Sequence, residues 1–282
     1  MSKANTEQIS KLLDSIIQNI ETSETGVFLI KHYNSVDLKR EMIENYFADK
    51  NGIKYVYHEF DSESMAEPYD PFLSYIKSVF YKEYTMTIDE FLDECGVYEL
   101  HKSVIKSYFE TGICKRTDEV LVSEYEYECQ MMQENIDNMF KYISSKERIV
   151  FVFNKLNYVN ESTLRILLGM IDNEKYNNIS IIAAYNEMSN NTDDVIELWK
   201  EYMDYLIRKE SVIEWSFSED KGDIDANSNF LFSVDKIPEY IDKICNMYHL
   251  MAIRQADYYL NLIYKKIEFE KLDISERYVF GL

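Results

Sequence analysis

Short apolar runs bounded by polar residues recur along the chain and predict buried β-strands. They cover residues 27–30, 53–60, 149–153, 179–185 and 211–217. Between these runs, hydrophobic residues return every three or four positions, which is the spacing of amphipathic helices. Strands that alternate with helices predict an α/β fold, with a three-layer parallel sheet of about five strands and helices on both faces.

Helical periodicity fills most of the remaining sequence. It predicts helices over residues 9–20, 36–49, 120–144, 236–246 and 247–269, one opened by Pro68 and Pro71, and one along Leu164, Leu167, Leu168 and Ile171. The acidic, tyrosine-containing residues 119–128 are expected to form a solvated helix face. An apolar stripe on the last helix is expected to run through Ile253, Ala256, Leu260, Ile263 and Ile267.

A polar, glycine-containing loop at residues 219–229 predicts a boundary that divides the chain into two parts. Residues 1–218 would form a P-loop-like α/β domain. Residues 230–282 would form a helical segment, either a lid or the start of TPR-like repeats.

The charge balance limits the classes of molecule that the chain is expected to bind. The chain has 51 acidic and 30 basic side chains, a formal net charge of −21. Nucleic-acid binding depends on Lys and Arg that release counterions from phosphates, so this charge argues against direct DNA or RNA binding. It fits a basic protein surface as partner, and equally a surface that is merely solvated.

The sequence gives no sign of a membrane or secretory protein. No apolar run reaches the roughly 18 residues of a membrane span, and residues 1–10 lack the apolar segment of a secretory signal. Four cysteines and four histidines are scattered without the spacing of a zinc site or a disulfide framework. We therefore expect a cytoplasmic protein that holds no metal.

Residues 148–168, RIVFVFNKLNYVNESTLRILL, combine an apolar strand, a polar turn and an amphipathic helix. This segment resembles the Walker B region of STAND-class ATPases, the signal-transduction relatives of the AAA proteins. In that family the strand ends in two acidic residues, then an aliphatic residue, Gln or His, Trp, a small residue, Asp and, two residues later, Ser-Leu. The corresponding residues here are Asn154, Lys155, Leu156, Asn157, Tyr158, Val159, Asn160, Thr163 and Leu164. A generic strand–turn–helix of another α/β protein is the alternative.

The differences at the end of this strand have a chemical consequence. The family's acidic pair anchors Mg²⁺ and polarises the attacking water. Asn154 offers a neutral carbonyl oxygen, and Lys155 places a cation where the metal complex would lie. Metal-assisted hydrolysis is therefore disfavoured.

The segment after the first strand departs from the family in the same way. A P-loop there would read G-x-x-x-x-G-K-[ST] and hold phosphates at the start of a helix. In the sequence KHYNSVDL, Lys31 and Val36 occupy the glycine positions, Asp37 the lysine position and Leu38 that of the metal-binding hydroxyl. Aspartate repels a triphosphate and leucine cannot bind a metal. The chain has only seven glycines, which already disfavours a phosphate loop.

Two further segments bear on the resemblance, which covers roughly residues 5–217. Family members often place an arginine after an Ala-Tyr-like pair at the end of the fourth strand, where this chain has Asn186. Residues 62–76, SESMAEPYDPFLSYI, are similar to the family's region after strand two. Considered alone, the segment after the first strand is an ordinary strand–helix loop, in which Asn34 and Ser35 would cap the helix.

The resemblance implies a pseudo-ATPase, a signalling or scaffold module without a cofactor. It would act through a protein partner, including its own downstream domains in a larger regulator of bacterial type. Two alternatives stay open. In the first, the chain holds ATP or ADP without efficient hydrolysis, through Lys31, Lys39 or Arg40. In the second, the chain is an enzyme of another class. For the latter, acidic pairs such as Asp93-Glu94 look like helix surface and supply no specific site.

Overall fold

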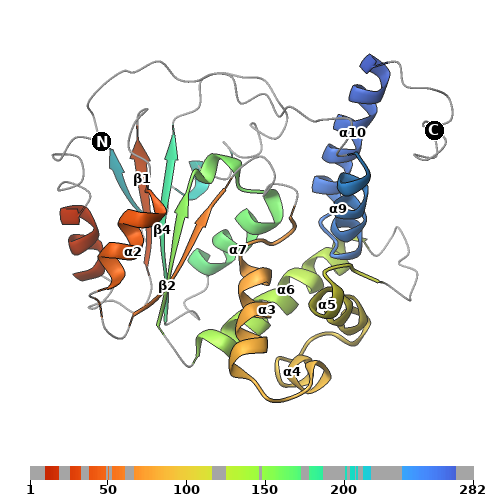
Figure 1. Ribbon diagram of the computed structural model, residues 1–282, viewed down its shortest axis with the longest axis horizontal. Helices are drawn as coiled ribbons and strands as arrows, with labels where there is room; N and C mark the ends of the chain where they lie inside the picture. The colour runs from red at the N-terminus through yellow and green to blue at the C-terminus, as the bar shows by residue number, and fades with distance from the viewer. Residues whose placement is uncertain are drawn as a thin grey trace.

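The apolar runs of the sequence form strands of one parallel sheet, in the order β2-β3-β4-β1-β5 (Figure 1). The strands are β1 (Gly26–His32), β2 (Lys54–Glu59), β3 (Ile149–Asn154), β4 (Ile179–Asn186) and β5 (Val212–Ser216). This computed structural model describes residues 10–18, 26–32, 38–48, 50, 53–60, 67–115, 125–145, 148–172, 178–186, 201, 204–206, 208, 212–216 and 237–270. The predicted α/β class, with a parallel sheet flanked by helices, is confirmed.

Helices cover the sheet and extend the molecule to one side. Residues 10–18 are helical, and a 3₁₀ turn, η3, covers Leu156–Tyr158. The α-helices are α2 (Arg40–Ala48), α3 (Phe72–Glu83), α4 (Ile88–Glu94), α5 (Glu99–Thr111), α6 (Tyr125–Ser144), α7 (Glu161–Asp172), α9 (Ile237–His249) and α10 (Ile253–Glu270).

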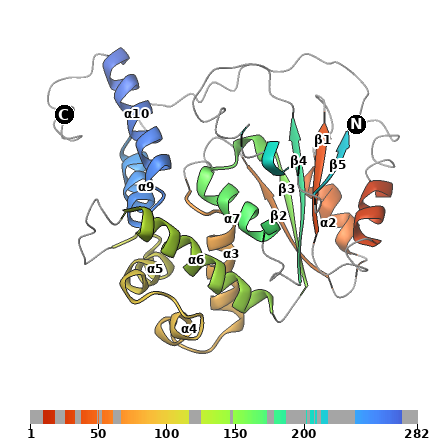
Figure 2. The ribbon, with the colours of Figure 1, turned by 180° about the vertical axis from the view of Figure 1, so that it is seen from behind.

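Alternate residues of each strand point to opposite faces of the sheet and feed two separate hydrophobic clusters. On one face, Phe28 and Val150 pack with helix 10–18 and α2. On the other face, Leu29 and Phe151 pack with α3, α6 and α7. Figure 1 and Figure 2 both show these three helices on the same side of the sheet. Strand β3 is buried at every position, which explains why its sequence is apolar without alternation.

The C-terminal helices α9 and α10 form a hairpin with a core of its own. Its buried residues are Ile237, Tyr240, Ile244, Met247, Ala252, Ala256, Tyr259 and Ile263. The connection between the helices reaches the main core, where Leu250 and Met251 join the larger cluster. The hairpin thus packs on the α/β body through its connection, through Lys243 and Asn246 of α9 and through the start of α10.

Two expectations for the hairpin were wrong. The boundary between its helices lies at residues 250–252, where Met251 has a φ of 59°, and α9 continues to His249. Leu260, expected in the buried stripe, is 42% exposed, whereas Tyr259 is 1% exposed. Ala256 and Ile263 of the predicted stripe are buried as expected, so α10 meets α9 through residues 256, 259 and 263, with Tyr259 in the place expected for Leu260.

The expected solvated face at residues 119–128 was also wrong at its C-terminal end. Residues 119–124 lie outside the described part of the chain, and Glu126 is exposed as expected. Glu128, however, is 4% exposed because it contacts His101 of α5, whose side chain is fully buried. A polar contact between two helices has replaced solvent there.

Candidate functional site

The order of the strands places a topological switch point at the carboxyl ends of β1 and β4. The chain leaves β1 for the edge strand β2, whereas it leaves β4 for β5 on the opposite side of β1. In open α/β sheets, ligands bind where neighbouring strands send their connections in opposite directions. Lys31 pairs with Tyr185, and His32 with Asn186, at this end of the sheet.

The structure places some of the predicted site residues at this edge. Lys31 lies near the end of β1, and Asn154 ends β3. Asn34, Ser35 and Asp37 lie outside the described residues, as does the side chain of Asn186, whose backbone ends β4.

Leu38, at the position of the metal-binding hydroxyl, belongs to the hydrophobic core. Its side chain is 1% exposed and packs with helix 10–18 and α2. Its carbonyl oxygen accepts a hydrogen bond of 2.7 Å from the Tyr57 hydroxyl of β2. The guanidinium of Arg40, the first residue of α2, lies 4.8 Å from the centre of the Tyr57 ring. The backbone after the loop is therefore anchored to β2.

Asn154 and Lys155 meet the end of β2, because Asn154 pairs with Glu59 in the β2–β3 register. Lys155 has a left-handed φ of 55°, and its Nζ lies 2.6 Å from Oε1 of Glu59. The Glu59 carboxylate at this end of β2 is thus paired with the cation that follows β3. Both side chains are partly exposed, so the pair contributes little to stability.

Asn154 is 1% exposed, and its Oδ1 accepts no hydrogen bond from the described residues. Its side chain also interacts with Tyr57. Burial, and next the Glu59 carboxylate, raise the pKa of Tyr57 to about 12, although the hydrogen bond with Asn154 opposes the rise. The phenol therefore stays protonated at neutral pH and remains a donor to the Leu38 carbonyl.

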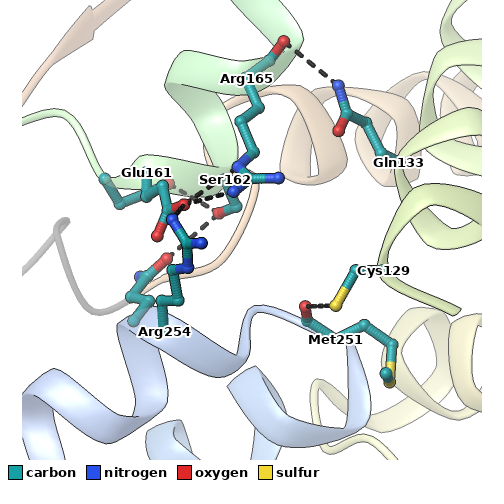
Figure 3. A network of polar contacts seen from close by, with 9 residues as sticks. Cys129, Gln133, Glu161, Ser162, Arg165, Met251 and Arg254 are labelled. Atoms are coloured by element: carbon teal, nitrogen blue, oxygen red, sulfur yellow. Dashed lines mark hydrogen bonds and ion pairs between the residues drawn. The ribbon is translucent and has the colours of Figure 1, made fainter. Parts of the chain in front are cut away.

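A second polar site forms where α7 meets the hairpin (Figure 3). We call it the α7–α10 junction, and it consists of Glu161, Ser162, Arg165, Arg254 and Gln255. Nε and Nη2 of Arg165 lie 3.0 and 2.7 Å from Oε1 of Glu161. Nη1 of Arg254 approaches the same oxygen to 3.6 Å. The Ser162 hydroxyl lies 3.2 Å from Oε1 of Gln255. One carboxylate therefore connects guanidinium groups from two helices.

The start of α7 fixes this junction. Asn160, matched in sequence to a family aspartate, caps the helix, since its Oδ1 accepts the Thr163 amide at 2.8 Å. Its Nδ2 donates to the Glu67 carbonyl at 2.7 Å, and the Thr163 hydroxyl donates to the Asp70 carbonyl at 2.6 Å. These bonds hold the chain before α3 against α7, so the resemblance at this turn coincides with a structural role.

A cavity of about 510 Å³ opens at the junction. It is lined by Tyr69, Glu126, Cys129, Gln130, Gln133, Glu161, Ser162, Arg165, Met251, Ala252, Ile253, Arg254 and Gln255. Burial raises the pKa of the Cys129 thiol, whose Sγ donates to the Met251 carbonyl at 3.1 Å. Sequence reasoning missed this site because its residues come from four separate segments. The Ser-x-x-Arg spacing of α7 gave no signal of its own.

Among the described residues, no group of three or more His, Cys, Asp or Glu side chains has the geometry of a metal site. The described helices include none that is long and apolar enough to cross a membrane. No protein-family model matches the sequence, and no curated protein matches it either. The function is therefore inferred from the chemistry of the sheet edge and the α7–α10 junction.

Proposed function

We propose that this chain is a regulatory or scaffold module with the architecture of a P-loop ATPase, a three-layer α/β domain of about five strands, that does not hydrolyse ATP. The observation that carries the proposal is the 2.6 Å ion pair between Lys155 and Glu59 at the carboxyl ends of β3 and β2. A metal–triphosphate complex needs carboxylates that are free to bind Mg²⁺ or its water ligands. Here a lysine ammonium holds the carboxylate, and the strand itself ends in a neutral amide.

Leu38 supports the same function. A hydroxyl at this position would have to face the metal, whereas the Leu38 side chain points into the core beneath α2. Converting the site to a hydrolytic one would therefore require changes in two elements. The frame of sheet and helices would then serve to present surfaces, not to turn over nucleotide.

The proposed mode of action is binding to a protein, including further segments of its own polypeptide. The net charge of −21 favours a basic partner surface. Leu260 and Tyr264, one turn apart on α10, expose large apolar side chains, at 42% and 47%. Exposed apolar residues within an acidic surface are typical of protein contacts when they lie next to one another.

The test is phosphate release from Mg·ATP together with the thermal stability of the protein. We expect no release above the buffer rate and no change in Tm with Mg·ATP. Turnover that is abolished in both Lys31→Ala and Asn154→Ala would overturn the proposal. Asn154→Asp with Lys155→Glu should not create turnover, because the phosphate loop also lacks its lysine and hydroxyl.

A residual ATP or ADP binder is the second candidate function. It is favoured by Arg40, which starts α2 and lies over the Tyr57 ring, close to the carboxyl edge of the sheet. A helix N-terminus and a guanidinium both attract phosphate. Calorimetry with ADP in the absence of metal separates the two candidates. Heat that disappears in Arg40→Gln and Lys39→Gln supports binding, and absence of heat at millimolar ADP rejects it.

A further inference from the structure

The cavity at the α7–α10 junction has the size and the lining of a small-molecule site. Its volume of about 510 Å³ falls within the roughly 300–1,000 Å³ of such sites. Met251, Ala252 and Ile253 supply apolar wall, whereas the glutamines, Ser162 and the two arginines supply hydrogen-bonding groups. These residues come from α6, α7 and the connection into α10, and Tyr69 before α3 completes the lining. It shares no residue with the carboxyl edge of the sheet.

The two arginines of the cavity differ in how closely they approach Glu161. Nε and Nη2 of Arg165 contact Oε1 of Glu161, and the Glu161 side chain is 12% exposed. Arg254 reaches the same oxygen only at 3.6 Å, beyond hydrogen-bond distance, and its side chain is 69% exposed. Two positive charges thus face one carboxylate, and the Arg254 guanidinium has donors available to an anion.

The charge around the cavity also favours an anion. Its four charged side chains, Glu126, Glu161, Arg165 and Arg254, sum to zero, whereas the whole chain carries −21. An anion therefore meets less repulsion here than the average over the surface. Planar guanidinium groups pair with carboxylates and phosphates through two parallel N–H donors, which fixes both the class and the orientation of the group they hold.

We propose that this cavity binds a small molecule that carries a carboxylate or a phosphate, with Arg254 and Arg165 holding the oxyanion. Met251 and Ile253 contact the apolar part of the molecule. Because Arg165 belongs to α7 and Arg254 to α10, the bound oxyanion connects the hairpin to the α/β body. Ligand binding then stabilises the docked position of the hairpin, and anything that binds only the folded, docked state raises Tm.

Isothermal titration calorimetry and thermal unfolding with inorganic phosphate and with citrate test the proposal, at ionic strength matched with potassium chloride. We expect at least one probe to bind at millimolar concentration and to raise Tm. Binding of phosphate alone indicates a phosphoryl ligand, and binding of citrate alone indicates a carboxylate. Failure of both probes to bind overturns the proposal.

Variants locate the binding. Arg254→Gln should weaken the affinity for the probe about ten- to hundredfold, as expected for the loss of charge-assisted hydrogen bonds. Arg165→Gln should have a similar effect. Arg208→Gln is the matched control, because Arg208 is an exposed arginine outside the cavity. Equal affinity in wild type and Arg254→Gln overturns the assignment.

Alkylation of Cys129 by iodoacetamide gives a check that does not depend on stability. Cys129 lines the cavity, and Cys245, the exposed cysteine, is replaced by serine for this measurement. A bound probe should slow modification of Cys129 several-fold in the Cys245→Ser protein, and Arg254→Gln should remove the protection. An unchanged rate at saturating probe overturns the proposal.

Discussion

Replacing His101 by leucine tests whether α5 and α6 are joined by a buried polar network. The His101 imidazole is fully buried, and its Nε2 lies 2.6 Å from Oε2 of Glu128. Nδ2 of Asn135 lies 2.6 Å from Nδ1, whereas Oδ1 of Asn135 accepts the Tyr98 amide at 2.9 Å. Since the Tyr98 bond fixes the amide, Asn135 donates to Nδ1. The imidazole proton is therefore on Nε2 and faces Glu128.

His101→Leu removes this donor from a carboxyl group that is 4% exposed. Breaking a buried pair by removing one partner costs about 3–5 kcal/mol, because the remaining polar group stays out of water. Each kcal/mol lowers Tm by roughly 2–4 °C in a domain somewhat smaller than this chain. We therefore expect a decrease in Tm of roughly 10 °C.

The assay is thermal and urea unfolding followed by circular dichroism, for His101→Leu, Glu128→Leu and the double variant. Replacing both partners removes the buried carboxyl group, so the double variant should lose less stability than the sum of the single variants. A loss below about 1 kcal/mol for His101→Leu would refute the reasoning, since a buried pair costs several times more to break. Strictly additive losses would refute it equally.

Three further predictions concern other parts of the molecule. Thr87→Ala removes the capping box of α4 and should lower the free energy of unfolding by about 1 kcal/mol, measured by urea unfolding. Because hydrogen bonds with Thr87 lower the pKa of Glu90, this difference in stability from wild type should shrink as pH falls below the ordinary pKa range of glutamate. Tyr57→Phe should flatten the loss of stability between pH 10 and about 12, the window in which the unfolded phenol ionises and the folded one does not. Asn246→Ala removes the side chain that accepts the Cys114 amide and donates to the Gly112 carbonyl, so hydrogen exchange in α9 and α10 should become faster, while exchange in β3 and β4 stays unchanged.

Strands β1, β3 and β4 were predictable because each contains an apolar run that is visible in the local sequence. Residues 149–153 show this best, since burial on both faces makes each of these positions hydrophobic. The end of α9 was not predictable in the same way. Met251 adopts a left-handed φ without glycine, and the position is held by its contact with Cys129 and by the main core, which the local sequence does not reveal.

The sheet edge was partly predictable and the α7–α10 junction was not. Lys155 and Asn154 lie where a strand–turn–helix pattern places them, although the ion pair with Glu59 depends on the β2–β3 register. The junction depends on contacts such as Ser162 with Gln255, which are 93 positions apart. Contacts between side chains so far apart in sequence produce no periodic pattern. Glutamines and arginines on a helix are also common on exposed faces, so their presence did not indicate a site.

The docking of the hairpin combines a small apolar contact with directional polar ones. Leu250 and Met251 enter the main core, but the remaining buried apolar residues of α9 and α10 pack on one another. Hydrogen bonds of Asn246 and Gln255 and the longer ion pair of Arg254 then fix its position on the body. Separating the hairpin would expose little of its own core, so its position is set mainly by these polar contacts, and those of Gln255 and Arg254 lie in the cavity where an anion can strengthen them. A regulatory input at the junction therefore needs to supply only a few hydrogen bonds to change how the hairpin is held.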